Sequence, residues 1–151
     1  MENANTVEIL NDLVEILNDR IEGYTRAKSE LDGKEPDINQ LCLDLIDESR
    51  TLRNELGTEV EVLKGEIDSD TTGRGKIYRV WMDIKAAFTG SDRHSVLAAC
   101  EYGEDAAQKA YKAALAEDGL PANLRSIIEN QKQILRSSHD QVKALRDAAV
   151  A

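Results

Sequence analysis

Apolar residues recur every three or four positions along four long stretches of the sequence, and this period restricts those stretches to amphipathic helices. Glycine and proline separate the stretches, so we expect helices over four ranges: residues 6–31, 36–64, 92–117 and 121–149. Each range is about 26 to 29 residues and would form a helix roughly 40 Å long. Helices of equal length can pack side by side along their whole extent, and no stretch carries the alternating pattern of a strand. The sequence therefore predicts an all-α fold.

The expected helix ends carry recognisable signals. Thr6 is expected to cap the first helix, because its hydroxyl can accept a backbone N–H, and Ser91 is expected to cap the third. Gly33 and Gly65 are expected to end the first two helices, since glycine readily adopts the left-handed backbone that follows many helices.

The lengths of the connections predict the topology. Short turns at Gly33 and Gly119 predict two antiparallel hairpins. The connection between the hairpins is long, and we expect a short amphipathic helix in it over residues 76–88, with Trp81 on its apolar face. Two hairpins joined by one long crossover is the connectivity of ferritin-like bundles. We therefore expect one domain over residues 1–151: a ferritin-like antiparallel four-helix bundle whose crossover carries a short extra helix.

Charge and hydropathy exclude several classes of partner. The formal net charge is −10, and an acidic surface repels phosphate backbones and anionic lipid, so we expect neither nucleic acid nor a membrane as a partner. No apolar run approaches the ~20 residues of a membrane span, and the acidic, polar start of the chain is unlike a signal peptide. Cys42 and Cys100 lie singly in apolar stripes, as small core residues of a reducing compartment do. We therefore expect a cytoplasmic protein.

Several segments carry a family likeness: Leu10-Asn11-Asp12-Leu13 through Glu22-Gly23-Tyr24, Trp81-Met82-Asp83-Ile84-Lys85-Ala86-Ala87, Cys100-Glu101-Tyr102-Gly103-Glu104-Asp105-Ala106-Ala107 through Tyr111, and His139-Asp140. In these segments the chain resembles a bacterial family of ferritin-like four-helix-bundle proteins, domain of unknown function 2383. The resemblance spans nearly the whole chain and implies a ferritin-like fold. It implies little about activity, because the family is itself uncharacterised and fold alone does not license function.

A carboxylate-bridged pair of metal ions in such a bundle needs one inward Glu from each of two helices and Glu-x-x-His from each of the other two. Neither His94 nor His139 has a Glu three residues before it. In the first helix, Glu15 and Glu22 point away from the apolar face on a helical wheel, so we expect both to be solvated. The full set of ligands for two metal ions is therefore missing.

A smaller polar cluster is nevertheless expected across the bundle, because Glu104 lies centrally on the apolar face of its helix, where carboxylates are rare. Its expected members share inward-facing positions on the four helices: Tyr24, Glu48, Glu104, Tyr111 and His139.

Three interpretations of this cluster stay open. In the first, His or Tyr satisfies a buried Glu and the network only fixes how the helices pack, which is the commoner situation. In the second, Glu104 and His139 bind a single metal ion with help from Glu48. In the third, the wheel misplaces Glu104 and it faces solvent.

The sequence contains no complete catalytic set, so the function we expect is non-catalytic. We predict a helical bundle that acts through protein contacts, with a homodimer as one form these contacts could take, and with no cofactor. The alternative is a metal-binding protein that holds iron or manganese at the carboxylate–histidine site.

Overall fold

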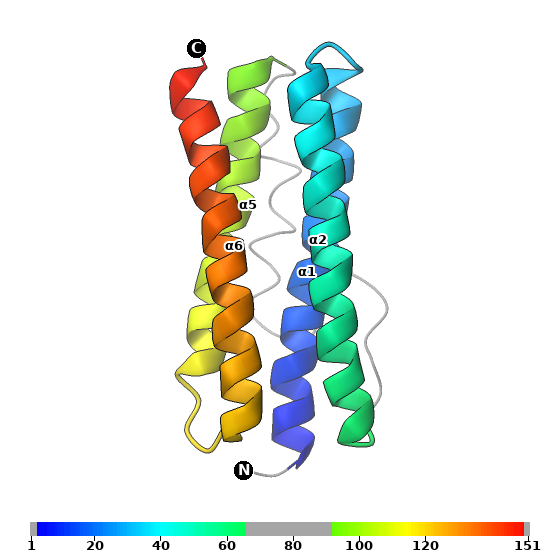
Figure 1. Cartoon of the computed structure of the whole chain (residues 1–151), viewed down its shortest axis with the longest axis vertical. Helices are drawn as coiled ribbons and strands as arrows, with labels where there is room; N and C mark the ends of the chain where they lie inside the picture. The colour runs from blue at the N-terminus through cyan, green and yellow to red at the C-terminus, as the bar shows by residue number, and fades with distance from the viewer. Residues whose placement is uncertain (1–2, 66–91, 150–151) are drawn as a thin grey trace.

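The computed structural model describes residues 3–65 and 92–149, and within these ranges the regular structure is entirely helical. Four helices are present: α1 (Asn3–Leu31), α2 (Pro36–Val62), α5 (Arg93–Leu115) and α6 (Ala122–Ala148). The prediction of an all-α, four-helix fold is confirmed (Figure 1). The short helix expected over residues 76–88 lies outside the described residues. None of the described helices is long and apolar enough to cross a membrane.

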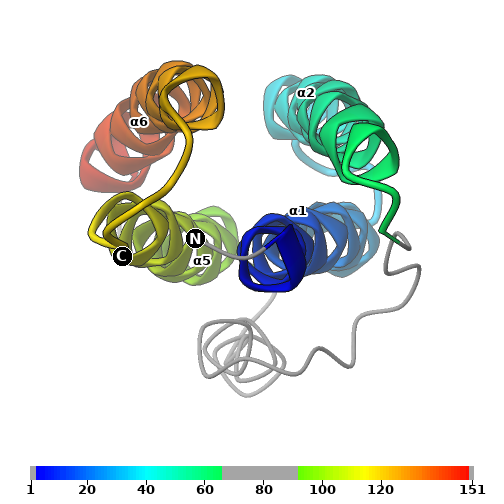
Figure 2. The same ribbon diagram turned by 90° about the horizontal axis from the view of Figure 1, so that it is seen from below.

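The four helices form two antiparallel hairpins, as the short turns predicted (Figure 1). Seen end-on, they occupy the corners of a square, with α1 beside both α2 and α5, and α6 beside α5 (Figure 2). The fourth side of the square, between α2 and α6, makes the fewest contacts. Because α2 ends and α5 begins at opposite ends of the bundle, the two helices run in the same direction, as expected for hairpins joined by one crossover.

The first and third helices begin differently from expectation. Helix α1 begins at Asn3, so Thr6 is not a cap but a buried residue inside the helix. The cap of α5 is Asp92 rather than Ser91: a carboxylate oxygen of Asp92 accepts a hydrogen bond from the Ser95 backbone N–H at 3.3 Å. Asp and Ser serve equally well at this position, so composition alone did not separate the two neighbours.

At the end of α2, Lys64 adopts a left-handed backbone with φ of 61°, and the Gly65 N–H donates to the Val60 carbonyl at 2.9 Å. This is the six-to-one bond of a Schellman turn. A Cβ atom at Gly65 would lie 2.7 Å from a methyl carbon of Val7, so glycine is needed here for close approach to α1. Gly65 thus closes the helix as predicted, although the helix itself ends at Val62.

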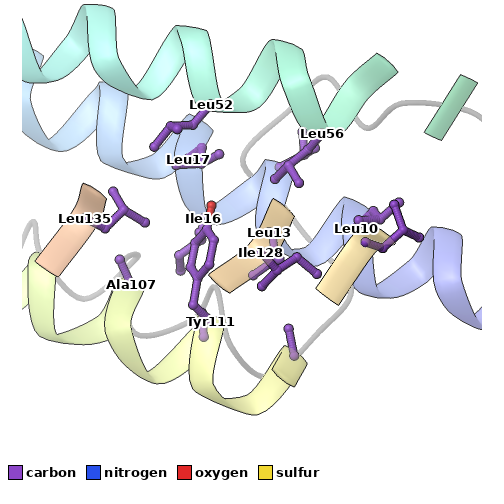
Figure 3. Packing of buried hydrophobic residues seen from close by; sticks show 14 of the residues in the cluster. Leu10, Leu13, Ile16, Leu17, Leu52, Leu56, Ala107, Tyr111, Ile128 and Leu135 are labelled. Atoms are coloured by element: carbon purple, nitrogen blue, oxygen red, sulfur yellow. The ribbon is translucent and has the colours of Figure 1, made fainter. Parts of the chain in front are cut away.

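Two apolar clusters fill the bundle, one at each end. The first joins all four helices around buried residues of α1 (Figure 3); its larger members are Leu10, Leu13, Ile16, Leu17, Leu52, Leu56, Tyr111, Leu124, Ile128 and Leu135. The second joins residues nearer the opposite end, among them Tyr24, Leu31, Ile38, Cys42, Leu45, Leu97, Cys100 and Val142. Both cysteines are free and buried in it, as expected.

Replacement of Leu56 by Ala should destabilise the fold, because its side chain is fully buried in the first cluster. We expect a loss of about 2–5 kcal/mol in the free energy of unfolding, measured by urea denaturation followed by circular dichroism. The matched control is Leu43→Ala on the same helix; Leu43 is 37% exposed, and we expect a loss under about 1 kcal/mol. Equal losses in the two variants would contradict the assignment of this core.

Candidate functional site

A layer of polar side chains crosses the bundle between the two apolar clusters. Each of the four helices contributes to it at the position where one cluster gives way to the other; its members are Arg20 on α1, Glu48 and Ser49 on α2, Glu104 on α5 and Ser138 on α6. We call this set the polar layer.

Arg20 is the centre of the polar layer, and its side chain is completely buried. Its Nε donates to Glu104 Oε1 at 2.5 Å and its Nη2 donates to Glu104 Oε2 at 2.9 Å, which is the two-pronged geometry of strong arginine–carboxylate pairs. Its Nη1 donates to Ser49 Oγ at 2.8 Å. Burial alone would lower the pKa of Arg20, but the attraction of Glu104 outweighs it and raises the pKa above its usual value. The guanidinium is therefore a permanent positive charge inside the bundle.

The layer continues through Glu48 to the fourth helix. Glu48 Oε1 lies 3.0 Å from Arg20 Nη1 and accepts a hydrogen bond from Ser138 Oγ at 2.8 Å. The Ser49 hydroxyl in turn donates a hydrogen bond to the Leu45 carbonyl oxygen of α2, at 2.8 Å. One arginine thus connects α1, α2 and α5 directly and α6 through Glu48.

The two predicted tyrosines have different surroundings. Tyr24 lies in reach of the polar layer: its ring centroid is 5.5 Å from the Arg20 guanidinium carbon, a cation–π distance. Its hydroxyl has no hydrogen-bond partner among the described residues. Burial raises the pKa of Tyr24, and the negative charge of the nearby Glu104 raises it further. Tyr111 instead donates its hydroxyl hydrogen to Gln131 Oε1 at 2.7 Å. Burial raises the pKa of Tyr111, so both tyrosines stay neutral.

Gln131, which accepts the Tyr111 hydrogen bond, also bonds to α2 and so forms a second link between α6 and α2. Its Nε2 donates to the Leu52 carbonyl at 3.1 Å and to Glu55 Oε1 at 2.7 Å. The side of the bundle with the fewest contacts is therefore bridged by polar groups at two heights, through Gln131 and through Ser138.

His139 lies in a different place from the other predicted ligands. Its Nε2 is 2.6 Å from Asp105 Oδ1 and 3.8 Å from Glu101 Oε1, and its Nδ1 is 3.1 Å from Asp140 Oδ1. Burial alone would lower the pKa of His139, but the hydrogen bonds to Asp140 and Asp105 raise it above its usual value. We call Glu101, Asp105 and His139 the seam cluster, because it spans the seam between α5 and α6.

The structure thus brings Glu104 and Glu48 together, but both carboxylates contact the Arg20 guanidinium rather than a space for a metal ion. In the described part of the chain, no hydrogen bond or ion pair joins His139 to either of them. The polar layer also lacks the ligand set of a carboxylate-bridged metal pair, as the sequence predicted: its cation is Arg20, and its members include no histidine. Binding of a metal ion by Glu104, His139 and Glu48 stays a prediction.

Arg20 is the residue that sequence reasoning missed. On a helical wheel Arg20 lies within about 60° of Leu13, Leu17 and Tyr24, so its inward position was visible in the pattern. A metal site needs acidic or imidazole ligands, so an arginine on this face gave no signal of one. The expectation that Glu15 is solvated was wrong: it is 2% exposed, whereas Glu22 is exposed as predicted. Since α1 packs against both α2 and α5, its buried arc is wider than one apolar stripe.

Comparison with known proteins identifies the family. The model of the family described as "Domain of unknown function (DUF2383)" matches residues 5–117, which cover α1, α2 and α5. The chain belongs to this family. The match includes the Arg20, Glu48, Ser49 and Glu104 positions and ends before α6, which holds Ser138 and His139. No curated protein matches the chain.

Removal of one partner of the Arg20–Glu104 pair should be much worse than removal of both. We expect Arg20→Met and Glu104→Leu each to cost about 3–5 kcal/mol in the free energy of unfolding, because each leaves a buried charge without the partner that makes two hydrogen bonds to it. The double variant should lose less than either single variant, measured by urea denaturation. Additive losses would show that the two side chains are not energetically coupled.

Asp19 predicts a pH dependence of stability. It is 4% exposed, and its Oδ2 has no hydrogen-bond partner in the described part of the chain. Burial and, to a smaller extent, the negative charge of the nearby Glu22 raise the pKa of Asp19 to about 7. Because the folded state holds this proton more tightly than the unfolded state, stability should fall as pH rises from about 4 to 7. Asp19→Asn should therefore stabilise the fold at pH 8 by about 1 kcal/mol or more, with little effect at pH 4.

Chemical denaturation at the two pH values measures this difference. Asp118→Asn is the control, because Asp118 is exposed in the turn between α5 and α6. An Asp19→Asn effect that is the same at both pH values would contradict a raised pKa.

Proposed function

We infer that this chain is a non-catalytic helical bundle that acts through contacts with other proteins in the cytoplasm. The observation that carries this proposal is the filled centre of the bundle. There the Glu104 and Glu48 carboxylates are engaged by Arg20 and Ser138. A divalent ion between these carboxylates would face the buried guanidinium at close range, and the repulsion between two cations in a buried site is strong.

The described surface also favours contacts over a small-molecule site. Two adjoining hollows near the start of α1 are open and are lined by polar and acidic residues together with a few apolar side chains; they share Ile9, Asp12 and Glu117. Small-molecule sites are more often enclosed and mainly apolar. None of the lining residues belongs to the polar layer or the seam cluster.

Large apolar side chains on the described surface are few but point to places where a partner could bind. Val62 is 68% exposed at the end of α2, Leu43 is exposed on the same helix, and Tyr102 is 42% exposed on α5. Both cysteines are free thiols, which suits the reducing compartment we propose. A second copy of the chain is the first partner to test.

A metal-binding function is the second candidate, with iron or manganese as the ions first considered. The observation that favours it is the seam cluster, in which one histidine and two carboxylates each offer a ligand atom. The polar layer does not contribute to this candidate.

Light scattering coupled to size exclusion tests the first proposal. We expect a mass near twice the 16.7 kDa of one chain, rising toward that value with salt because screening reduces repulsion between copies of net charge −10. Val62→Glu should shift the protein toward monomer, because it places a charge on the most exposed large apolar side chain described.

Thr58→Glu, on the same helix and exposed, is the matched control and should leave the mass unchanged. A monomer at every concentration and salt level would contradict self-association. Aerobic oxidation of Fe(II) by the protein faster than in buffer, and lost in Glu104→Gln, would contradict the non-catalytic assignment.

A further inference from the structure

The seam cluster has the composition and spacing of a metal site that does not involve the bundle centre. Glu101 and Asp105 are four residues apart on α5, so their side chains project from the same face of one helix. His139 reaches them from α6. One nitrogen and two carboxylate oxygens from these residues all lie within 4.8 Å of one another. All three side chains come from helices, which hold ligands more precisely than loops do.

Asp140 contacts the ring nitrogen of His139 that faces away from the seam cluster, and so orients the ring. Nδ1 of His139 lies 3.1 Å from Asp140 Oδ1, and when Nδ1 carries the hydrogen it donates to that oxygen. Without an ion, Nε2 donates to Asp105 Oδ1 at 2.6 Å; once Nε2 gives up that hydrogen, its lone pair is available to an ion held by Asp105 and Glu101. Most metal-binding histidines bind the metal through one ring nitrogen and donate from the other to a carboxylate, a backbone carbonyl or water.

Glu101 is oriented in a similar way. Its Oε2 accepts a hydrogen bond from Arg146 Nη1 at 2.5 Å, which leaves Oε1 as the oxygen nearer the imidazole, 3.8 Å from His139 Nε2. Each of these two ligands therefore has one atom fixed by a neighbour and one atom directed into the cluster.

The distances need only a small adjustment to hold an ion. Bonds of about 2.0–2.2 Å to nitrogen and oxygen separate the ligand atoms of a tetrahedral ion by roughly 3.4 Å. Nε2 of His139 is closer than this to Asp105 Oδ1, at 2.6 Å, and farther from Glu101 Oε1, at 3.8 Å. The Asp105 side chain is 49% exposed and can move outward, and this exposure leaves solvent access for an ion and its water ligands.

We propose that Glu101, Asp105 and His139 bind one divalent first-row transition-metal ion, such as Zn²⁺ or Mn²⁺, with water completing its coordination. Two carboxylates offset the charge of such an ion, and one of them, Glu101, also pairs with Arg146. The imidazole favours transition metals over Mg²⁺ and Ca²⁺, which prefer oxygen ligands alone. This proposal rests on the second candidate function and gives it its ligands and its class of ion. The site shares no residue with the polar layer or with the exposed apolar side chains Val62, Leu43 and Tyr102, so its test is independent of the test for self-association.

The experiment is a titration of the full, untagged chain with Zn²⁺, Mn²⁺ or Mg²⁺ alone, followed by isothermal calorimetry and by elemental analysis after dialysis. We expect about one Zn²⁺ or Mn²⁺ per chain and at least tenfold weaker binding of Mg²⁺. Asp105→Asn and His139→Gln should each weaken binding at least tenfold, and Asp140→Asn should weaken it about tenfold by releasing the ring.

His94→Gln and Glu104→Gln are the controls, and both should leave binding unchanged. Asp105→Asn is the safer variant, since Asp105 is half exposed and its loss should not unfold the chain; circular dichroism checks the fold of each variant. Unchanged binding in Asp105→Asn and His139→Gln would overturn the proposal. So would loss of binding in His94→Gln or in a folded Glu104→Gln, or absence of Zn²⁺ and Mn²⁺ binding in the wild type.

Discussion

The bundle depends on one buried ion pair, between Arg20 and Glu104. Taking both charges out of water is costly, and the cost is recovered only where the geometry is close to ideal. Here the guanidinium meets Glu104 with two hydrogen bonds and meets Ser49 and Glu48 with its remaining nitrogen, Nη1. A slip of α1 against α5 by one helical turn would move these groups about 5.4 Å apart. The pair therefore favours the one register of α1 against α5 in which both hydrogen bonds form.

The polar layer also explains how the bundle tolerates its loosely packed side. The hairpins meet mainly where α1 lies against α5, while α2 and α6 are in less contact. On that side the links are hydrogen bonds, from Ser138 to Glu48 and from Gln131 to Leu52 and Glu55. Since Glu48 is also held by Arg20, the charge at the centre positions the acceptor that α6 needs. Loss of Arg20 would therefore affect both sides of the square.

Periodicity was enough to predict the four helices, their two turns and the inward position of Glu104, because each depends on residues near in sequence. The partner of Glu104 depended on a second helix, and here prediction failed. Arg20 was visible on the inner face of α1, but nothing in one helix tells which residue of another it will meet. Glu15 failed for a related reason, since burial on α1 is set by two neighbouring helices rather than by its own apolar stripe.

The surroundings of His139 show that a shift of one residue along a helix decides which side chains meet. Glu104 and Asp105 are adjacent on α5, and about 100° around the helix separates an acid that points to the centre from one that points to the seam. On α6 the same step separates Ser138, which reaches Glu48, from His139, which reaches Asp105. A histidine turned by this one step meets Asp105, which is open to water, and Glu101, which is also paired with Arg146. The Glu104 and Glu48 carboxylates are thus committed to Arg20 in the core, whereas Asp105, next to Glu104 in sequence, keeps a side chain that is 49% exposed. An ion bound at the seam cluster, as proposed, would therefore not compete with the contacts that hold the helices together.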